Sequence, residues 1–171
     1  RLLRTARLDR FWLIAYALSV IYVMATVSGD INKFLAYMPS GVNSVFRTFS
    51  AVVGVLSIFF LSMAFAARQL NLRYSLGFCA LFILHLLASA SSVLLVSVVP
   101  MLFAFLTGYT LGGGRKTLLI LLVSLGCLNV LHAAKWPMRE KYWPQFSGTL
   151  ANLKPWDYPS YYSEWFSLGI A

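Results

Sequence analysis

Five apolar segments alternate with short polar stretches along the 171-residue chain. The apolar residues within each segment are continuous, which is typical of membrane-spanning helices, whereas membrane-spanning strands show short alternating patterns. We therefore expect an all-α fold, a polytopic transmembrane helical bundle. The predicted spans are about residues 11–27, 49–67, 75–90, 93–111 and 117–134.

The division between the third and fourth spans rests on length. From Leu76 to Leu111 the chain runs for 36 residues without Asp, Glu, Lys or Arg. As one helix these residues would extend about 54 Å at 1.5 Å per residue, against a hydrocarbon core of roughly 30 Å. The small, hydroxyl-rich stretch ASASS, residues 88–92, is the predicted turn. If the chain instead crosses only once here, the bundle has four spans.

Composition excludes a soluble domain. Apolar residues make up 60% of the chain and charged residues 11%, whereas a soluble domain carries about 25% charged residues. We expect residues 1–171 to form a single transmembrane domain. Because the chain starts at Arg1 and stops within an apolar stretch, we also expect it to be a fragment of a longer protein. Cys79 and Cys127 fall in separate spans, so neither a disulfide framework nor a metal site is expected.

Basic residues suggest an orientation but leave both span counts open. With five spans and a cytoplasmic N-terminus, eight Lys and Arg residues lie inside and six outside; with four spans the numbers are ten and four. The positive-inside rule prefers four spans, while the length argument prefers five. We favour five, which makes the aromatic-rich segment 135–171 extracytoplasmic. The excess of 14 basic over 5 acidic residues then reflects loop topology and contact with anionic lipids rather than nucleic acid.

A basic and aromatic cluster follows the last predicted span, in the stretch HAAKWPMREKYW. His132, Lys135 and Arg139 are spaced i, i+3 and i+7, which places them on one face of a helix. Pro137 complicates this arrangement, and we expect the span to end near Trp136 and a second short helix to follow. Arg offers a planar fork for phosphate oxygens, Lys a point charge, and His a proton acceptor near neutral pH. The alternative is that these residues only anchor the helix end at the membrane interface.

Ten aromatic residues lie between Trp136 and Phe166. Their flat apolar faces with polar edges suit the C–H faces of sugar rings and equally suit a membrane interface. The candidate glycan-stacking residues are Trp136, Trp143, Trp156, Tyr161 and Trp165. His85, in the middle of the third span, is expected to be a neutral, hydrogen-bonded packing residue, because no carboxylate accompanies it there.

The succession ASASS, apolar span, GYTLGGGRK, apolar span and NVLHAAKWPMREKYW, over roughly residues 75–145, resembles part of the bacterial O-antigen and exopolysaccharide polymerases. The resemblance implies a protein of the bacterial inner membrane that joins glycan repeat units carried on undecaprenyl-pyrophosphate at the outer face, with no cofactor and no metal. Other membrane proteins of polysaccharide assembly are candidate partners. We interpret Lys135 and Arg139 as diphosphate-binding residues and His132 as a catalytic base or orienter of the acceptor hydroxyl.

Two other functions remain as alternatives. A transporter component would use His85 and Pro100 as features of a pathway, but the chain lacks the paired interruptions in its two halves that transporters show. A non-catalytic membrane subunit would use the basic and aromatic cluster only for anchoring. The sequence predicts a membrane protein but does not decide among these three functions.

Overall fold

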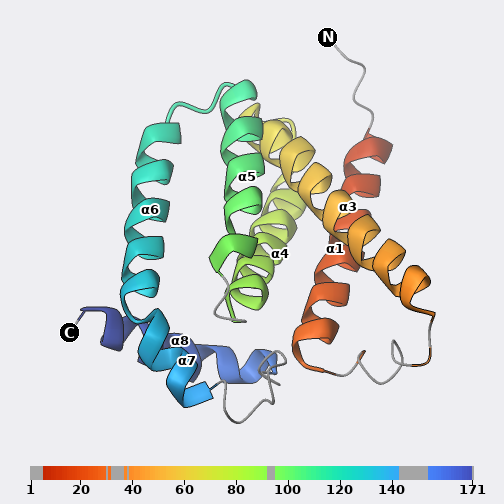
Figure 1. The fold of residues 1–171 in the computed structure, drawn as a ribbon. Helices are drawn as coiled ribbons and strands as arrows, with labels where there is room; N and C mark the ends of the chain where they lie inside the picture. Colours follow the sequence, from red (N-terminus) through yellow and green to blue (C-terminus); the bar gives the residue numbers. More distant parts are fainter. Residues whose placement is uncertain are drawn as a thin grey trace.

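The computed structural model describes residues 6–29, 31, 37, 39–91, 95–142 and 154–170, and their regular structure is entirely helical. Figure 1 shows the arrangement of the helices. The elements are α1 (Ala6–Val27), α3 (Ser40–Ala66), α4 (Leu72–Ala90), η1 (Leu95–Ser97), α5 (Val99–Leu111), α6 (Thr117–Ala133), α7 (Lys135–Tyr142), η3 (Pro155–Asp157) and α8 (Tyr158–Ile170).

Three helices are long and apolar enough to cross a membrane: Leu8–Val27 within α1, Gly41–Ala66 within α3, and Leu72–Ala90, which is α4. A fourth span results if α6 and α7, which are bent by 51° at their junction, are counted together. The apolar stretch Leu95–Leu111 is a shorter helix. The expected all-α fold of the membrane-spanning type is therefore confirmed, with three to four helices of spanning length among the described residues.

The predicted break within the long apolar stretch is also present. α4 ends at Ala90, and η1 and α5 follow from residue 95 onward. Two serine side chains bond to backbone carbonyls at this end of α4: Ser91 Oγ donates to Ala88 O at 2.7 Å and Ser97 Oγ donates to the backbone oxygen of Ser89 at 2.9 Å. In Figure 1 the chain descends along α4 and returns upward along α5. This stretch is thus not one continuous helix, because α4 and α5 run in opposite directions.

The second predicted span has the wrong N-terminal boundary. The apolar pattern predicts residues 49–67, whereas α3 begins at Ser40 and includes the more polar stretch SGVNSVFRT. Hydropathy marks the apolar part of a helix, but backbone hydrogen bonding continues into polar residues until something stops it. Here Pro39 immediately precedes the helix, at a position where its missing N–H removes no helical hydrogen bond.

Small residues allow α5 to pack directly on α3. A Cβ atom at Gly108 would overlap the Ser62 side chain and the Phe59 carbonyl, and one at Gly112 would overlap the Met63 carbonyl. The GxxxG spacing of the two glycines places both on one helix face, the arrangement that lets backbones of membrane helices approach closely. α1 completes this side of the bundle by packing on both α3 and α4.

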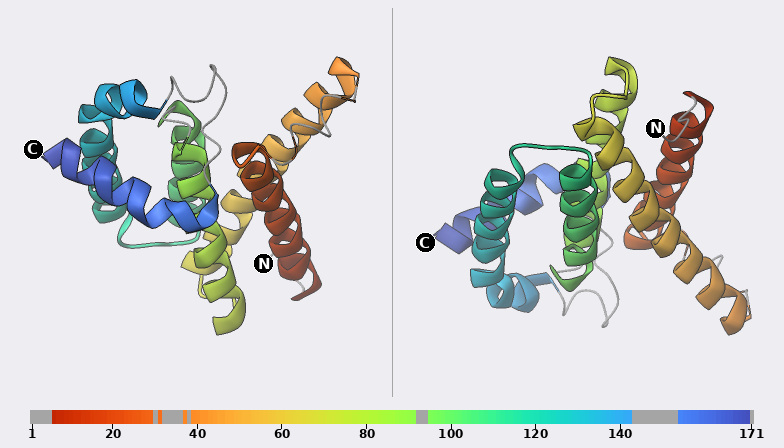
Figure 2. Two further views of the ribbon diagram at one scale, coloured as in Figure 1. Left: turned by 90° about the horizontal axis from the view of Figure 1, so that it is seen from below. Right: turned by 90° about the horizontal axis from the view of Figure 1, so that it is seen from above.

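The core has two clusters. One lies among α1, α3, α4 and α5 and includes Tyr16, Ile58 and Phe78, all almost completely buried. The other lies where α8 meets α6, α7 and the end of α4, and Trp165 is completely buried in it. Figures 1 and 2 show α8 running across the ends of the upright helices rather than alongside them.

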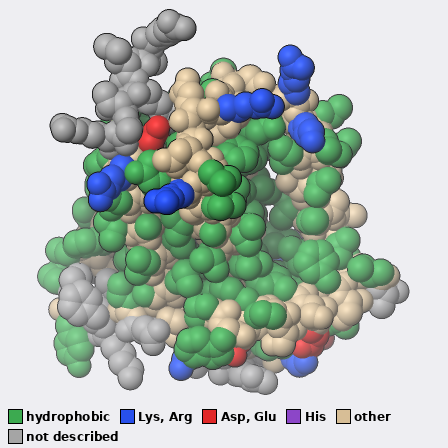
Figure 3. Space-filling model, turned by 180° about the vertical axis from the view of Figure 1, so that it is seen from behind, with side chains coloured by type: hydrophobic (Ala, Val, Ile, Leu, Met, Phe, Trp, Pro, Cys, Tyr) green, Lys and Arg blue, Asp and Glu red, His purple; other side chains and the backbone are tan. Residues whose placement is uncertain are grey.

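Charged side chains lie toward the two ends of the bundle. On the face in Figure 3, Lys and Arg side chains gather near the upper end, a few charged groups lie at the lower end, and apolar side chains cover the surface between them. The upper end carries the turn of residues 67–71 and the turn of residues 112–116, while α7 and α8 lie at the lower end. The candidate site residues after α6 therefore belong to the lower end.

Candidate functional site

The junction between α6 and α7 positions the predicted cluster. α6 ends at Ala133, and α7 begins at Lys135 after a bend of 51°. The expected break is present, two residues earlier than Pro137, which falls at the third position of α7. Proline is tolerated in a first turn because the N–H groups there have no helical partner. The bend separates His132, in the last turn of α6, from Arg139, in the second half of α7.

His132 and Lys135 line the same groove. The groove lies between α6 and the η1–α5 segment, has a volume of about 510 Å³ and is widely open. Its other lining residues are almost all apolar: Leu95, Val96, Val99, Leu125, Leu128 and Asn129. The His132 side chain is exposed and the Lys135 side chain half-buried. The groove thus combines one cation and one imidazole with apolar walls. Its volume is within the range of small-ligand sites.

Arg139 and Trp136 do not line this groove. The guanidinium carbon of Arg139 lies 5.6 Å from the centre of the Trp136 ring, which is within cation–π range. Trp136 is 67% exposed. The predicted single face of three basic residues is therefore divided: His132 and Lys135 share the groove, while Arg139 is held against Trp136 on α7.

The predicted glycan-stacking residues separate into two groups. Trp136 and Trp156 are exposed, and the Lys154 ammonium lies 5.1 Å from the Trp156 ring centre. Tyr161 and Trp165 are 2% and 0% exposed, so their ring faces contact protein, and a stacking role for them does not fit these positions. Trp143 lies outside the described residues.

The buried aromatic residues of α8 instead fasten that helix to the bundle. Tyr161 Oη donates to the Ser91 carbonyl at 3.1 Å, and Trp165 Nε1 donates to the Leu131 carbonyl at 2.8 Å. The spacing of these residues in the sequence indicates this role, although the number of aromatic residues alone does not. Tyr158, Tyr161, Tyr162 and Trp165 are the buried residues of α8, and they recur at i, i+3, i+4 and i+7, the pattern of one buried helix face.

An ion pair joins α7 to α8. Lys141 Nζ lies 2.5 Å from Glu164 Oε1, and the Tyr142 hydroxyl donates to Glu164 Oε2 at 2.9 Å. Hydrogen bonding from Lys141, followed by that from Tyr142, lowers the pKa of Glu164. The same bond to Glu164 raises the pKa of Lys141, and burial raises the pKa of Tyr142. Glu164 is thus occupied by two partners in this structure, an arrangement of a structural contact rather than of a poised general base.

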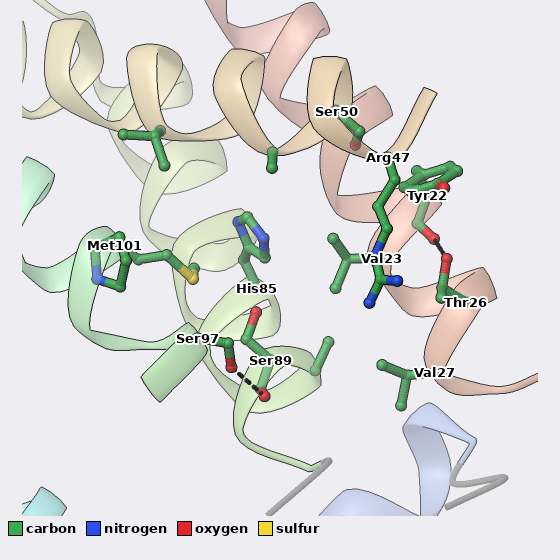
Figure 4. Close-up of a pocket in the computed structure, with 14 residues that line it drawn as sticks. Tyr22, Val23, Thr26, Val27, Arg47, Ser50, His85, Ser89, Ser97 and Met101 are labelled. Atoms are coloured by element: carbon green, nitrogen blue, oxygen red, sulfur yellow. Dashed lines mark hydrogen bonds between the residues drawn. The ribbon is translucent and has the colours of Figure 1, made fainter. Parts of the chain in front are cut away.

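A second cavity brings together polar residues that lie far apart in the sequence. It has a volume of about 350 Å³ and lies among α1, α3, α4 and the start of α5. In Figure 4 the Arg47 side chain extends from α3 into this cavity, and the His85 imidazole faces it from α4. The predicted span, which begins at residue 49, leaves Arg47 in a loop. The sequence signal for its role would be that no helix-breaking residue separates Arg47 from the apolar residues that follow it.

Comparison with known proteins does not assign a function to the groove or to the cavity. Comparison of the chain with protein families, with curated proteins and with solved structures gives no match. Among the described residues, no group of three or more His, Cys, Asp and Glu side chains is placed to hold a metal ion. Functional inference therefore rests on the geometry of the groove and the cavity.

Proposed function

We propose that the chain is an integral membrane protein of surface polysaccharide assembly that binds a lipid-linked glycan of the undecaprenyl-pyrophosphate type. The observation that carries the proposal is the apolar groove between α5 and α6 that ends at His132 and Lys135. An amphiphile with a long apolar chain and an anionic headgroup matches that sequence of apolar and basic side chains. A soluble anion would leave the apolar walls without a partner.

The two parts of such a ligand match two parts of the groove. Leu125, Leu128 and Val99 line it with aliphatic side chains, which suit an isoprenoid tail. Lys135 supplies a positive charge for the diphosphate. Arg139 follows one turn later on α7, and its guanidinium would join the diphosphate after leaving the Trp136 ring.

The reaction that fits these groups is transfer of a glycan between two lipid-linked units. An acceptor hydroxyl attacks the anomeric carbon of the donor, a new C–O bond forms, and the bond from that carbon to the diphosphate oxygen breaks. The hydroxyl proton passes to His132, and the negative charge on the departing diphosphate is stabilised by Lys135. This step needs neither metal nor nucleotide, because the diphosphate is itself the leaving group.

The proposed membrane arrangement has five crossings, a cytoplasmic N-terminus and an extracytoplasmic segment 135–171 in a bacterial inner membrane. The reversal of the chain after Ala90 supports this arrangement, because α5 and α6 then complete an up-and-down series. The location of α7 and α8 at the same end as the turn after α4 supports it as well. The groove residues His132 and Lys135 would then face the side on which surface polysaccharides are assembled.

The test uses a photoreactive polyprenyl diphosphate and the purified chain. Wild-type protein is expected to be labelled in α5 or α6, and Lys135→Gln is expected to reduce labelling about fivefold or more, because one cation near a membrane anion is worth about 1 kcal/mol. Lys116→Gln is the matched control, since this exposed lysine lies at the other end of α6. Equal labelling of wild type and Lys135→Gln would overturn the proposal.

A cellular measurement separates catalysis from binding. His132→Gln, in cells that contain all other assembly proteins, is expected to shorten the polymer while leaving membrane insertion and labelling by the lipid diphosphate unchanged. Normal polymer with His132→Gln, together with lost labelling in Lys135→Gln, would instead identify a non-catalytic membrane subunit or a transporter component that holds the lipid.

A further inference from the structure

The cavity around Arg47 is separate from the groove between α5 and α6. Its walls come from α1, α3, α4 and the η1–α5 segment, and no residue that the structure describes lines both the cavity and the groove. Its volume of about 350 Å³ is within the range of small-molecule sites. The lining is mainly apolar and includes Val23, Val27, Val55 and Met101.

Arg47 is an uncommon residue for this position. It is the eighth residue of α3, and it lies inside the 26-residue stretch Gly41–Ala66 that has the length and hydropathy of a membrane span. Figure 4 shows its guanidinium extending into the cavity between α1 and α4. Arg47 is exposed and lies near the N-terminal end of this stretch, so its guanidinium is accessible to an anionic partner. An ionised group within a spanning segment is a candidate functional site. None of the described residues that line the cavity carries a carboxylate.

Further polar groups line the cavity among the apolar side chains. His85 is 6% exposed and lines the cavity, and its Nδ1 lies 3.3 Å from the Tyr16 hydroxyl. Ser50 also lines the cavity, and its hydroxyl is buried without a hydrogen-bond partner among the described residues. A buried hydroxyl without a partner is unfavourable and marks a place where a ligand would supply the missing bond. The cavity thus combines one cation with several hydroxyl groups, an imidazole and aliphatic side chains.

We propose that this cavity binds the phosphodiester headgroup of one anionic phospholipid. The Arg47 guanidinium would contact two phosphate oxygens through its planar fork. Ser50 would donate to a phosphate or glycerol oxygen, and the upper part of an acyl chain would lie along Val23, Val55 and Met101. A phospholipid fits better than a free anion because most of the lining is apolar and because the host helices belong to the membrane. The site is additional to the proposed glycan-lipid groove and does not depend on it.

Native mass spectrometry of the whole chain in detergent tests this site. Wild-type protein is expected to retain one phosphatidylglycerol in preference to phosphatidylcholine of the same acyl chains. Arg47→Gln is expected to reduce the retained fraction about fivefold or more. Arg115→Gln is the matched control, because this exposed arginine lies in the turn before α6 at the opposite end of the bundle. Circular dichroism and thermal unfolding establish that each variant is folded.

A second variant tests the cavity without touching the charge. Ala51 lines the cavity and is exposed, so Ala51→Phe fills part of the space while Arg47 remains. Loss of phosphatidylglycerol in both Arg47→Gln and Ala51→Phe, with retention in Arg115→Gln, supports the proposal. Equal retention of the two lipids by wild type, or an equal loss in Arg115→Gln, overturns it. Displacement of the lipid by millimolar inorganic phosphate would identify a site for a soluble anion and would also overturn it.

Discussion

The indole Nε1 of Trp165, in α8, donates a hydrogen bond of 2.8 Å to the backbone carbonyl of Leu131, near the end of α6. The last carbonyls of a helix have no partner within that helix, so a side chain from a distant segment satisfies one of them here. Trp165 is completely buried in the same contact. The crosswise orientation of α8 therefore depends on hydrogen bonding as well as on apolar packing.

Replacing Trp165 with Phe is expected to lower the free energy of unfolding by about 1–3 kcal/mol. The variant leaves the Leu131 carbonyl buried without its donor and leaves unfilled volume around the smaller ring. The measurement is thermal or denaturant unfolding in detergent. Trp156→Phe is the control, because Trp156 is 71% exposed and its replacement should leave stability unchanged. Equal effects of the two substitutions would contradict the assigned role.

The pair Lys141–Glu164 predicts how the contact between α7 and α8 varies with pH. Because the pKa of Glu164 is lowered in the folded protein, its contribution to stability is complete above the ordinary value of about 4.5 and is lost as pH falls through the lower folded-state pKa. Because the pKa of Lys141 is raised, its contribution is complete below about 10.5 and is lost as pH rises through the higher folded-state value. The contact should be strongest between these limits.

Amide hydrogen exchange of α7 and α8 measures this dependence. Protection is expected to be constant between about pH 6 and 9 after correction for intrinsic exchange, and to decrease in acid. Glu164→Gln should reduce protection at neutral pH, whereas Glu140→Gln, at an exposed position on α7, should not. Protection that is unchanged by Glu164→Gln would show that the aromatic contacts of α8 are sufficient without the ion pair.

Gly108→Ala is expected to destabilise the bundle by about 1–3 kcal/mol, because the added methyl group would overlap the Ser62 side chain and the Phe59 carbonyl. Gly126→Ala provides a matched control within another apolar helix. Nothing lies within 4 Å of a Cβ atom at Gly126, so this change should stabilise α6 by about 0.5–1 kcal/mol through helix propensity. Unfolding in detergent compares the two. Similar effects would contradict the close approach of α5 to α3.

Cysteine labelling decides between four and five crossings whichever way the chain is oriented in the membrane. In a background lacking Cys79 and Cys127, single cysteines replace Tyr37, Gly113 or Ser160. Five crossings place positions 37 and 160 on one side of the membrane and 113 on the other. Four crossings place 37 and 113 together and 160 opposite. A membrane-impermeant maleimide applied to intact and permeabilised cells measures the side directly, and labelling of 37 and 160 from opposite sides would contradict the proposed arrangement.

Length and hydropathy are sufficient to predict most helices and the break near residues 88–92. Length and hydropathy are informative because a helix that crosses the hydrocarbon core needs an apolar segment of limited length. They are insufficient for the start of α3, because the backbone continues as a helix through polar residues such as Asn43 and Arg47. The boundary predicted from hydropathy therefore excludes Arg47 from the span and conceals the cavity that this side chain enters.

The candidate site is predictable in part for a similar reason. The spacing of His132 and Lys135 correctly suggests proximity, since both line one groove. Extending the same helix to Arg139 fails because α7 is bent by 51° from α6. For Tyr161 and Trp165, residue type alone suggests sugar binding, whereas their helical periodicity indicates burial. Which side of an aromatic helix is buried depends on neighbours distant in sequence, here Leu131 and Ser91.

The close contact of Gly108 and Gly112 with α3 also has a consequence for the opposite end of the same two helices. α3 and α5 touch backbone to backbone near the upper end and diverge toward the lower end, where Arg47 and Met101 border the cavity (Figure 1). The two helices are thus closest where α5 carries the two glycines and farther apart where the cavity lies. A residue larger than glycine at position 108 or 112 is therefore expected to push α5 away from α3 and to change the space that the Arg47 cavity offers to a ligand.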